Sequence, residues 1–144
     1  MNARINIENL EPEAYQAMFG LEKYLSNSTV APPIFELIKI RASQLNGCAF
    51  CMEMHTQGAL KLGMSASKLF AIAVWKESSL FTEQERAVLA ITDEVTLIHQ
   101  RGVTDVTYQG VSAHFTGPEI AQIIMRIATI NVWNRMGVAT PLEQ

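Results

Sequence analysis

The stretch Cys48-Ala49-Phe50-Cys51-Met52-Glu53-Met54-His55 holds the only two cysteines of this 144-residue chain. It follows Asn46-Gly47, a pair that favours a left-handed cap at the end of one helix and a sharp turn into the next. If a helix begins near Cys48, then at 100° per residue Cys48, Cys51 and His55 lie within about 60° of one another. Two thiols and an imidazole on one helix face form a candidate redox site.

The rest of the chain has the periodicity of helices, and no stretch shows the apolar and polar alternation of a half-buried strand. Because 144 residues, 49% of them hydrophobic, suffice for one core, we expect an all-α, single-domain helical bundle over residues 1–144. Its last helix is apolar over much of its circumference, which favours a place in the core or in a subunit contact. The seven predicted helices, some with their caps, span about 12–25, 32–46, 48–62, 66–75, 82–100, 104–115 and 117–136.

Charge and hydropathy exclude several kinds of partner. With a net charge of −3 and no run of Lys or Arg, the chain lacks the basic surface that nucleic acid or anionic lipid would require. No stretch approaches the ~18 uncharged apolar residues of a membrane span, and residues 1–7 lack the apolar core of a secretory leader. We therefore expect a soluble, cytoplasmic protein. In that reducing compartment a single cysteine pair is more often catalytic or metal-binding than a structural cross-link.

The predicted helix start offers a way to activate the thiols. A cysteine reacts as its thiolate, and at its ordinary pKa near 8.5 little of it is ionised at neutral pH. Cys48 lies at the helix N-terminus, where free backbone N–H groups and the helix dipole favour an anion. Cys51 lies one turn further on, with His55 at its i+4 position, so the imidazole can accept the thiol proton.

Glu36 is the third candidate, for a geometric reason. It lies ~15 Å before the Asn46-Gly47 break, and His55 lies ~10 Å beyond it, so a folded-back helix pair brings carboxylate and imidazole together. Glu36 also falls in the apolar sequence 34–38, where a buried carboxylate needs a partner. We expect it to orient the ring of His55.

These residues carry a resemblance to a known family. Glu36, eleven further residues, Cys48-x-x-Cys51, three more and then His55 resemble the motif of the AhpD-like alkylhydroperoxidase core in the carboxymuconolactone decarboxylase superfamily. The flanking sequences 40–48 and 54–56 and a late Asn134-Arg135 are similar as well. The resemblance extends over about residues 14–137 and is strongest over 36–63.

The resemblance implies an all-α fold that assembles as trimers or hexamers, with thiol peroxidase or disulfide reductase chemistry. It implies Cys48 and Cys51 as the redox pair and Glu36 and His55 as a proton relay. No organic cofactor is implied, because the sulfur pair carries the electrons. One departure is Phe50, which stands where some members of the family have a second histidine.

The leading hypothesis is a thiol-dependent peroxidase whose partners are a peroxide substrate and an external thiol or dithiol reductant. One thiolate attacks the O–O bond, becomes a sulfenic acid and condenses with the other cysteine. The i+4 histidine and the family favour Cys51 as the attacking residue, whereas the dipole favours Cys48 as the one attacked during re-reduction.

Several alternatives stay open at this point. The chain could be a redox switch or a structural helical oligomer without efficient turnover, or it could have carboxymuconolactone decarboxylase-like activity, although that branch generally lacks the cysteine pair. Zinc held by Cys48, Cys51, His55 and Glu36 satisfies the ligand count, but structural zinc sites usually draw ligands from separated elements. The two cysteines could also be core residues with no chemistry.

Some polar residues outside this group need partners of their own. Asn131 and Asn134 lie on the apolar last helix, and we expect them to hydrogen-bond a neighbouring subunit. Arg41 and Arg135 are expected in surface or interhelix salt bridges. His99 and His114 show no matching pattern and are assigned no role.

Overall fold

The computed structural model describes residues 4–140, and all of the regular structure in this range is helical. The predicted all-α class is confirmed, and each of the seven predicted helices is present. The short helix α1 is additional, and the predicted helix 82–100 is divided into α6 and α7. In chain order the elements are α1 (Ile7–Leu10), α2 (Pro12–Ser26), α3 (Pro32–Asn46), α4 (Ala49–Lys61), α5 (Ala66–Ala71), η1 (Ile72–Glu77), α6 (Glu83–Thr96), α7 (Ile98–Arg101), α8 (Asp105–Ser112) and α9 (Gly117–Ala139).

Helix starts follow the capping residues in the sequence. Thr82 and Glu85 form a capping box at α6, and Thr116 and Glu119 form another at α9, so each pair satisfies backbone N–H groups of the first turn. Proline stands in the first turn of α2, α3 and α9, where its missing N–H costs nothing.

The predicted helix 66–75 is instead divided into α5 and η1. Val74 leaves the helical region, with φ −125° and ψ 33°, and this distorts the last turns. The guanidinium of Arg86 donates hydrogen bonds of 3.0–3.1 Å to the carbonyls of residues 75, 76 and 78. A charged side chain from α6 thus satisfies carbonyls that a regular helix would have paired internally.

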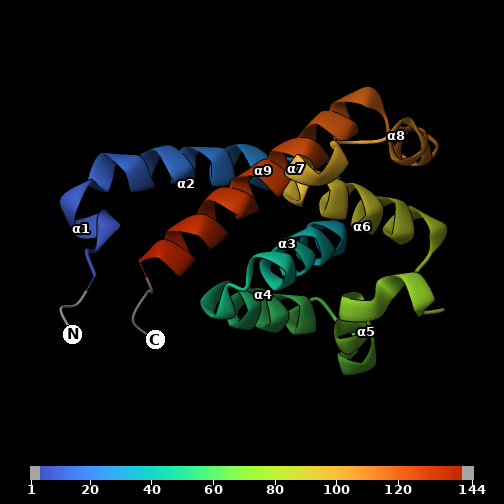
Figure 1. Cartoon of the computed structure of the whole chain (residues 1–144), viewed down its shortest axis with the longest axis horizontal. Coiled ribbons are helices and arrows are strands. Elements are labelled where there is room, and N and C mark those ends of the chain that lie inside the picture. The colour runs from blue at the N-terminus through green and yellow to red at the C-terminus, as the bar shows by residue number, and fades with distance from the viewer. Residues whose placement is uncertain (1–3, 141–144) are drawn as a thin grey trace.

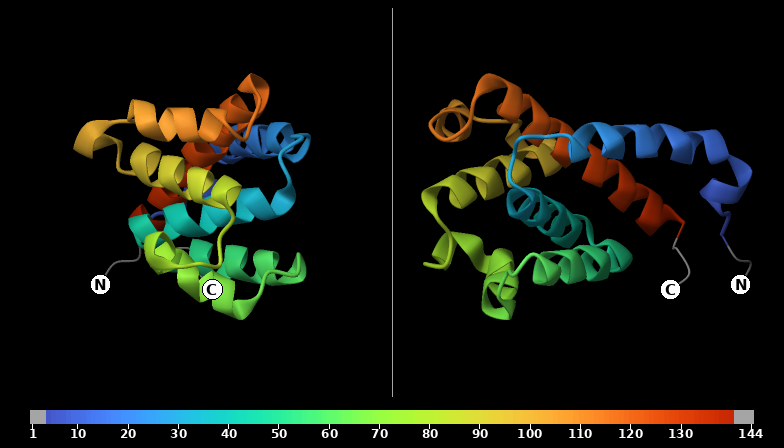
Figure 2. Two further views of the ribbon diagram at one scale, coloured as in Figure 1. Left: turned by 90° about the vertical axis from the view of Figure 1, so that its right-hand side faces the viewer. Right: turned by 180° about the vertical axis from the view of Figure 1, so that it is seen from behind.

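Helix α3 is the centre of the molecule, because it packs against α4, α6 and α9. Figures 1 and 2 show α4 along one side of α3, with α2 and α9 on the other. Its buried residues divide between two apolar clusters. Ile34, Ile38 and Ala42 join the cluster formed with α6 and α9, whereas Leu37 and Ile40 join the one formed with α4, η1 and α6. A helix buried on opposite sides in this way fixes the positions of its neighbours.

The turn between α3 and α4 has the geometry that the Asn46-Gly47 pair predicts. Gly47 adopts φ 67° and ψ 33°, a left-handed conformation that glycine reaches without steric penalty. The N–H of Cys48 then donates to the carbonyl of Ser43 at 3.1 Å and closes the helix end. As a result α4 runs back along α3 with the cysteines at its start.

The two asparagines of α9 find their partners inside the chain, so the prediction of an intersubunit contact is wrong. The amide of Asn46 donates to Asn131 at 2.9 Å and to Asn134 at 3.0 Å. Asn134 donates in turn to Ser43, and Asn131 donates to Thr96. The C-terminal end of α3 is therefore joined to α9 by a polar network in which Asn134 is fully buried.

The two arginines behave differently from each other. Arg41 forms the expected interhelix salt bridge, to Asp93 of α6, which also accepts a hydrogen bond from the indole of Trp75. Arg135 instead donates to the carbonyl and side chain of Asn131 in its own helix, and it forms no salt bridge with any residue in the range 4–140.

The N-terminal segment is attached to the end of α9. Arg4 donates hydrogen bonds to the carbonyls of Val138 and Ala139, at 3.3 Å and 2.9 Å, in the last turn of that helix. Figure 1 shows α1 and the end of α9 on the same side of the molecule. None of the helices within residues 4–140 is both long enough and apolar enough to span a membrane.

Candidate functional site

The two cysteines form a disulfide at the start of α4. Cys48 is the N-cap, and its sulfur accepts a hydrogen bond of 3.4 Å from the N–H of Cys51, one turn into the helix. Both residues are buried, with 2% and 4% of their surface exposed. In the reduced protein, a thiolate at Cys48 would lie against the free N–H groups and the positive end of the helix dipole.

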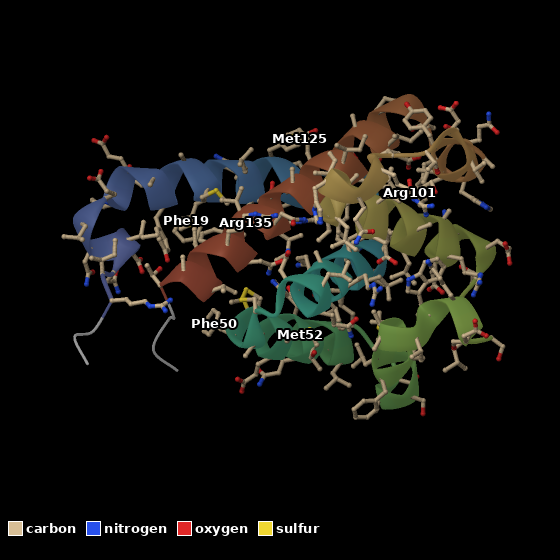
Figure 3. The ribbon with its side chains drawn as sticks, in the orientation of Figure 1. Phe19, Phe50, Met52, Arg101, Met125 and Arg135 are labelled. Atoms are coloured by element: carbon tan, nitrogen blue, oxygen red, sulfur yellow. A yellow bond between two sulfur atoms is a disulfide. The ribbon has the colours of Figure 1, made fainter. Side chains whose placement is uncertain are left out.

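Gly137 of α9 closes the other side of the disulfide. A Cβ atom at this position would lie 3.0 Å from the sulfur of Cys48 and 3.8 Å from that of Cys51, so the sulfur atoms occupy the space that a side chain would need. Figure 3 shows the disulfide between the start of α4, near the labelled Phe50, and the last turns of α9. The sulfur pair is therefore shielded by a helix from a distant part of the sequence.

We predict that Gly137→Ala weakens the disulfide relative to the dithiol, because two bonded sulfur atoms are less able than two free thiols to move away from the added methyl group. Crowding of this kind typically costs 1–3 kcal/mol, so the equilibrium constant for disulfide formation against glutathione should fall about tenfold. Quantifying dithiol and disulfide protein in defined glutathione buffers measures this constant.

Gly20→Ala is the matched control, since nothing lies within 4 Å of a Cβ at Gly20 in the exposed part of α2. An unchanged equilibrium constant in Gly137→Ala would show that the close approach does not constrain the sulfur pair.

His55 and Glu36 meet across the α3–α4 pair, as the folded-back geometry predicts. The Nδ1 atom of His55 lies 3.8 Å from one carboxylate oxygen of Glu36. That distance is too long for a hydrogen bond, so the expectation that Glu36 directly orients the ring is not met. The other carboxylate oxygen instead pairs with Nζ of Lys39 at 2.7 Å. Gly58 of α4 also lies close to Glu36, since a Cβ added there would be in van der Waals contact with the carboxylate.

A second ion pair lies nearby. Arg126 of α9 is 2% exposed and forms two hydrogen bonds, of 2.8 and 2.6 Å, with the carboxylate of Glu22 in α2. Trp133 donates a third to the same carboxylate. Burial alone would raise the pKa of Glu22, but these hydrogen bonds and the charge of Arg126 hold it below its ordinary value. Glu22 is therefore a carboxylate at neutral pH.

The surroundings of His55 keep its imidazole neutral. Burial, followed by the positive charges of Lys39 and Arg126, lowers the pKa of His55 to about 4, and Glu22 opposes this only in part. At neutral pH the ring can thus accept a proton, but the resulting imidazolium is strongly acidic and gives the proton up readily.

The low pKa of His55 predicts a pH-dependent stability. Between about 6.5, its ordinary pKa, and about 4, the unfolded chain binds a proton that the folded chain does not. The free energy of unfolding should therefore decrease as the pH falls through this window, by up to about 1.4 kcal/mol per pH unit. Urea titrations across the window measure the slope.

His55→Gln should flatten this slope above pH 4.5, whereas His99→Gln, at an exposed position, should keep it. Carboxylates with a lowered pKa, such as Glu22, weaken the fold only as the pH falls below their ordinary value of 4.5, so they do not obscure the result. An equal slope in the parent and His55→Gln proteins would contradict the assignment.

A cavity of about 210 Å³ lies between α2, α3 and α9. Its lining includes Glu36 and Lys39 of α3, Glu22 of α2 and Arg126 of α9, together with apolar side chains. Neither cysteine nor His55 lines it. Of the four candidate site residues, only Glu36 therefore lines the cavity.

Three residues that shape the surroundings of His55 or of the disulfide were not predicted from the sequence: Lys39, Arg126 and Gly137. Lys39 could have been found, because it stands three residues after Glu36, a spacing at which helical side chains meet. Arg126 is the one charged residue between positions 120 and 134, which is a weaker signal. The role of Gly137 depends on where α9 lies and has no local signal. Among residues 4–140 no group of three or more His, Cys, Asp or Glu side chains is arranged to hold a metal ion, so the zinc alternative gains no support.

Comparisons with known proteins agree with this fold and motif. The model of the carboxymuconolactone decarboxylase family matches residues 12–94. The uncharacterized protein YdfG of Bacillus subtilis is 35% identical over 139 residues, which cover 96% of this chain and 95% of YdfG. A crystal structure from Agrobacterium tumefaciens, of a protein of unknown function described as a candidate antioxidant defence protein AhpD, is 40% identical, with a TM-score of 0.93. It covers 99% of this chain and 100% of that one.

A more distant structure shares the fold. It is an uncharacterized peroxidase-related protein from Ralstonia eutropha, described as an alkylhydroperoxidase AhpD core. It is 18% identical, with a TM-score of 0.82, over 94% of this chain and 73% of its own. The chain therefore belongs to the carboxymuconolactone decarboxylase family and has its AhpD-like fold.

Proposed function

We propose that this protein is a thiol-dependent peroxidase that reduces hydroperoxides through Cys48 and Cys51. The observation that carries the proposal is the disulfide at the N-terminus of α4, with a neutral imidazole one turn further along the same helix. Such an arrangement combines a stabilised thiolate, a proton acceptor and a partner cysteine. The Agrobacterium relative is described as a candidate antioxidant defence protein, which supports the same class of reaction.

In the proposed reaction Cys51 gives its thiol proton to His55, and the thiolate attacks the terminal oxygen of the hydroperoxide. The O–O bond breaks, the sulfur becomes a sulfenic acid, and the leaving alkoxide takes the proton from the imidazolium to form an alcohol. The thiolate of Cys48 then attacks the sulfenic sulfur, hydroxide leaves and is protonated to water, and the disulfide results. An external thiol or dithiol returns two electrons by thiol–disulfide exchange.

The burial of both sulfur atoms has a consequence for this cycle. An external thiolate needs a direct approach to the disulfide, and the end of α9 at Gly137 stands against it. In the proposed cycle, re-reduction therefore requires local opening, either of the first turn of α4 or of the last turns of α9.

The direct test is stopped-flow measurement of thiol oxidation in the reduced protein, with hydrogen peroxide and an alkyl hydroperoxide as substrates. Cys51→Ser should abolish rapid oxidation, whereas Cys48→Ser should still form a sulfenic acid but no intramolecular disulfide. A rate constant for the parent protein no larger than that of free cysteine would remove the peroxidase proposal and favour a redox switch or structural oligomer. Turnover of a carboxymuconolactone without peroxide would favour the decarboxylase alternative.

We predict that His55→Gln lowers the rate of peroxide reduction at pH 7 by about 10²–10⁴-fold, because the proton acceptor is lost. The rate should partly recover at higher pH, where the thiol ionises unaided. Glu36→Gln should act in the same direction but less strongly, since its carboxylate does not hydrogen-bond the ring.

The double variant should be little slower than His55→Gln alone, as expected for groups of one relay. His99→Gln is the control and should retain the parent rate. Fully additive losses, or an undiminished rate in His55→Gln, would mean that helix position alone activates the thiol.

We also propose that the chain forms a homo-oligomer, a trimer or hexamer as the family resemblance implies. The described surface exposes large apolar side chains, including Phe70 at 82%, Val106 at 80% and Phe19 at 54%. On α9, Val132 and Val138 are more than two-fifths exposed, and exposed apolar area of this extent is typical of subunit contacts.

Sedimentation at micromolar concentration should give a species of three or six chains, and a 16.0 kDa particle would contradict the proposal. We further propose a cytoplasmic location, where thiols that could reduce the disulfide are available.

A further inference from the structure

We propose that Lys39 is a positioning residue of the relay, which holds the carboxylate of Glu36 away from His55 and so keeps carboxylate and imidazole from forming a hydrogen-bonded pair. The inference rests on the proposed function, because it assigns Lys39 a role in the same proton transfer. Lys39 acts on the ring of His55 through its ion pair with Glu36 and through its own positive charge.

The geometry of one carboxylate with two possible partners supports this role. Lys39 stands three residues after Glu36 on α3, and its Nζ atom lies 2.7 Å from Oε1. The second oxygen, Oε2, is buried without a hydrogen-bond partner and lies 3.8 Å from Nδ1 of His55. Since an N–H···O hydrogen bond requires about 2.7–3.2 Å, a movement of under about 1 Å would transfer the carboxylate to the ring. The ion pair to Lys39 opposes that movement.

Burial makes this ion pair effective. The side chains of Lys39 and Glu36 are only 16% and 12% exposed, so water screens the pair weakly. A Cβ atom added at Gly58 of α4 would lie 3.4 Å from Oε2 of Glu36, so α4 passes close to this carboxylate. A surface ion pair at the same helical spacing would contribute far less.

The charges around His55 come from three neighbouring helices. Helix α3 supplies Glu36 and Lys39, α9 supplies Arg126, and α2 supplies Glu22. Arg126 and Glu22 bind each other, so their effects on the ring partly cancel. Lys39 is the charged group that contributes most to the low pKa of His55. It therefore has two effects, a direct repulsion of the imidazolium and an indirect one through the position of Glu36.

The position of Glu36 between Lys39 and His55 matters because the ring must both accept and release a proton. An imidazolium hydrogen-bonded to a buried carboxylate would bind its proton more tightly and would release it more slowly to the leaving alkoxide. With Glu36 held by Lys39, the imidazolium is stabilised only across 3.8 Å. Lys39 thereby favours the donating half of the cycle.

The test compares Lys39→Met with Lys39→Arg, which retains the positive charge. The ring protons of His55 are titrated by NMR in the disulfide form, with the resonance assigned by its loss in His55→Gln. Lys39→Met should increase the proton affinity of His55 about tenfold or more, and Lys39→Arg should stay near the parent. Lys23→Met, which removes an exposed lysine from α2, is the matched control for loss of one charge.

A double variant separates the two effects of Lys39. If Lys39 also acts by holding Glu36, Lys39→Met combined with Glu36→Gln should increase the proton affinity of His55 clearly less than Lys39→Met alone, because only the loss of direct repulsion remains. An equally large increase in the double variant would mean that charge repulsion alone accounts for it and would overturn the positioning role. An unchanged proton affinity in Lys39→Met would overturn it as well.

A kinetic readout follows in the reduced protein. The rate of thiol alkylation by iodoacetamide, measured against pH, should show its lower inflection displaced upward in Lys39→Met but not in Lys39→Arg. A purely structural lysine would change the thermal midpoint of unfolding without moving this inflection. Because neither measurement uses a peroxide, failure of this inference is distinguishable from failure of the peroxidase proposal. Should Lys39→Met fold poorly, Lys39→Gln with the same titration replaces it, and the same outcomes apply.

Discussion

The reversal of the chain at Gly47 is the constraint on which the rest of the site depends. Because the glycine is left-handed, α4 folds back along α3, and the N-terminus of α4 lies against the end of α9. The same reversal places Glu36, far back on α3, beside the second turn of α4, where His55 stands. One backbone conformation thus positions both the dipole end that favours a thiolate and the ring that can accept its proton.

The second structural theme is partly buried charge close to His55. Arg126 with Glu22, and Lys39 with Glu36, are ion pairs whose cations lie almost entirely inside the protein. Removing one partner would leave the mostly buried Glu36 or the buried Arg126 without its counter-charge, which destabilises the fold, whereas the more exposed Glu22 is partly screened by water. Their common effect is on His55, which lies near all four groups and is held in its neutral form. These charged groups, together with burial, therefore determine the pKa of the His55 imidazole.

Much of this molecule could be predicted from local sequence, and the rest depended on contacts between distant segments. The starts of α6 and α9 follow from Thr-x-x-Glu capping boxes, and the α3–α4 turn follows from Asn46-Gly47. The partners of Asn131 and Asn134 could not be predicted, because they depend on how the end of α3 meets α9. The pairing of Glu36 with Lys39 was decided by a difference of about 1 Å between two competing partners, which helical spacing cannot resolve.

The hydrogen bonds of Arg4 give the chain ends an importance that terminal residues rarely have. The carbonyls of Val138 and Ala139 belong to the last turn of α9, which otherwise lacks intrahelical donors, and Arg4 supplies them. Gly137, in the same turn, forms one wall around the sulfur of Cys48. Trimming residue 4, or attaching an affinity tag close to it, therefore frays the wall of the disulfide and makes the sulfur atoms more accessible. The surroundings of the disulfide therefore depend on Arg4, which lies far from the cysteines in the sequence.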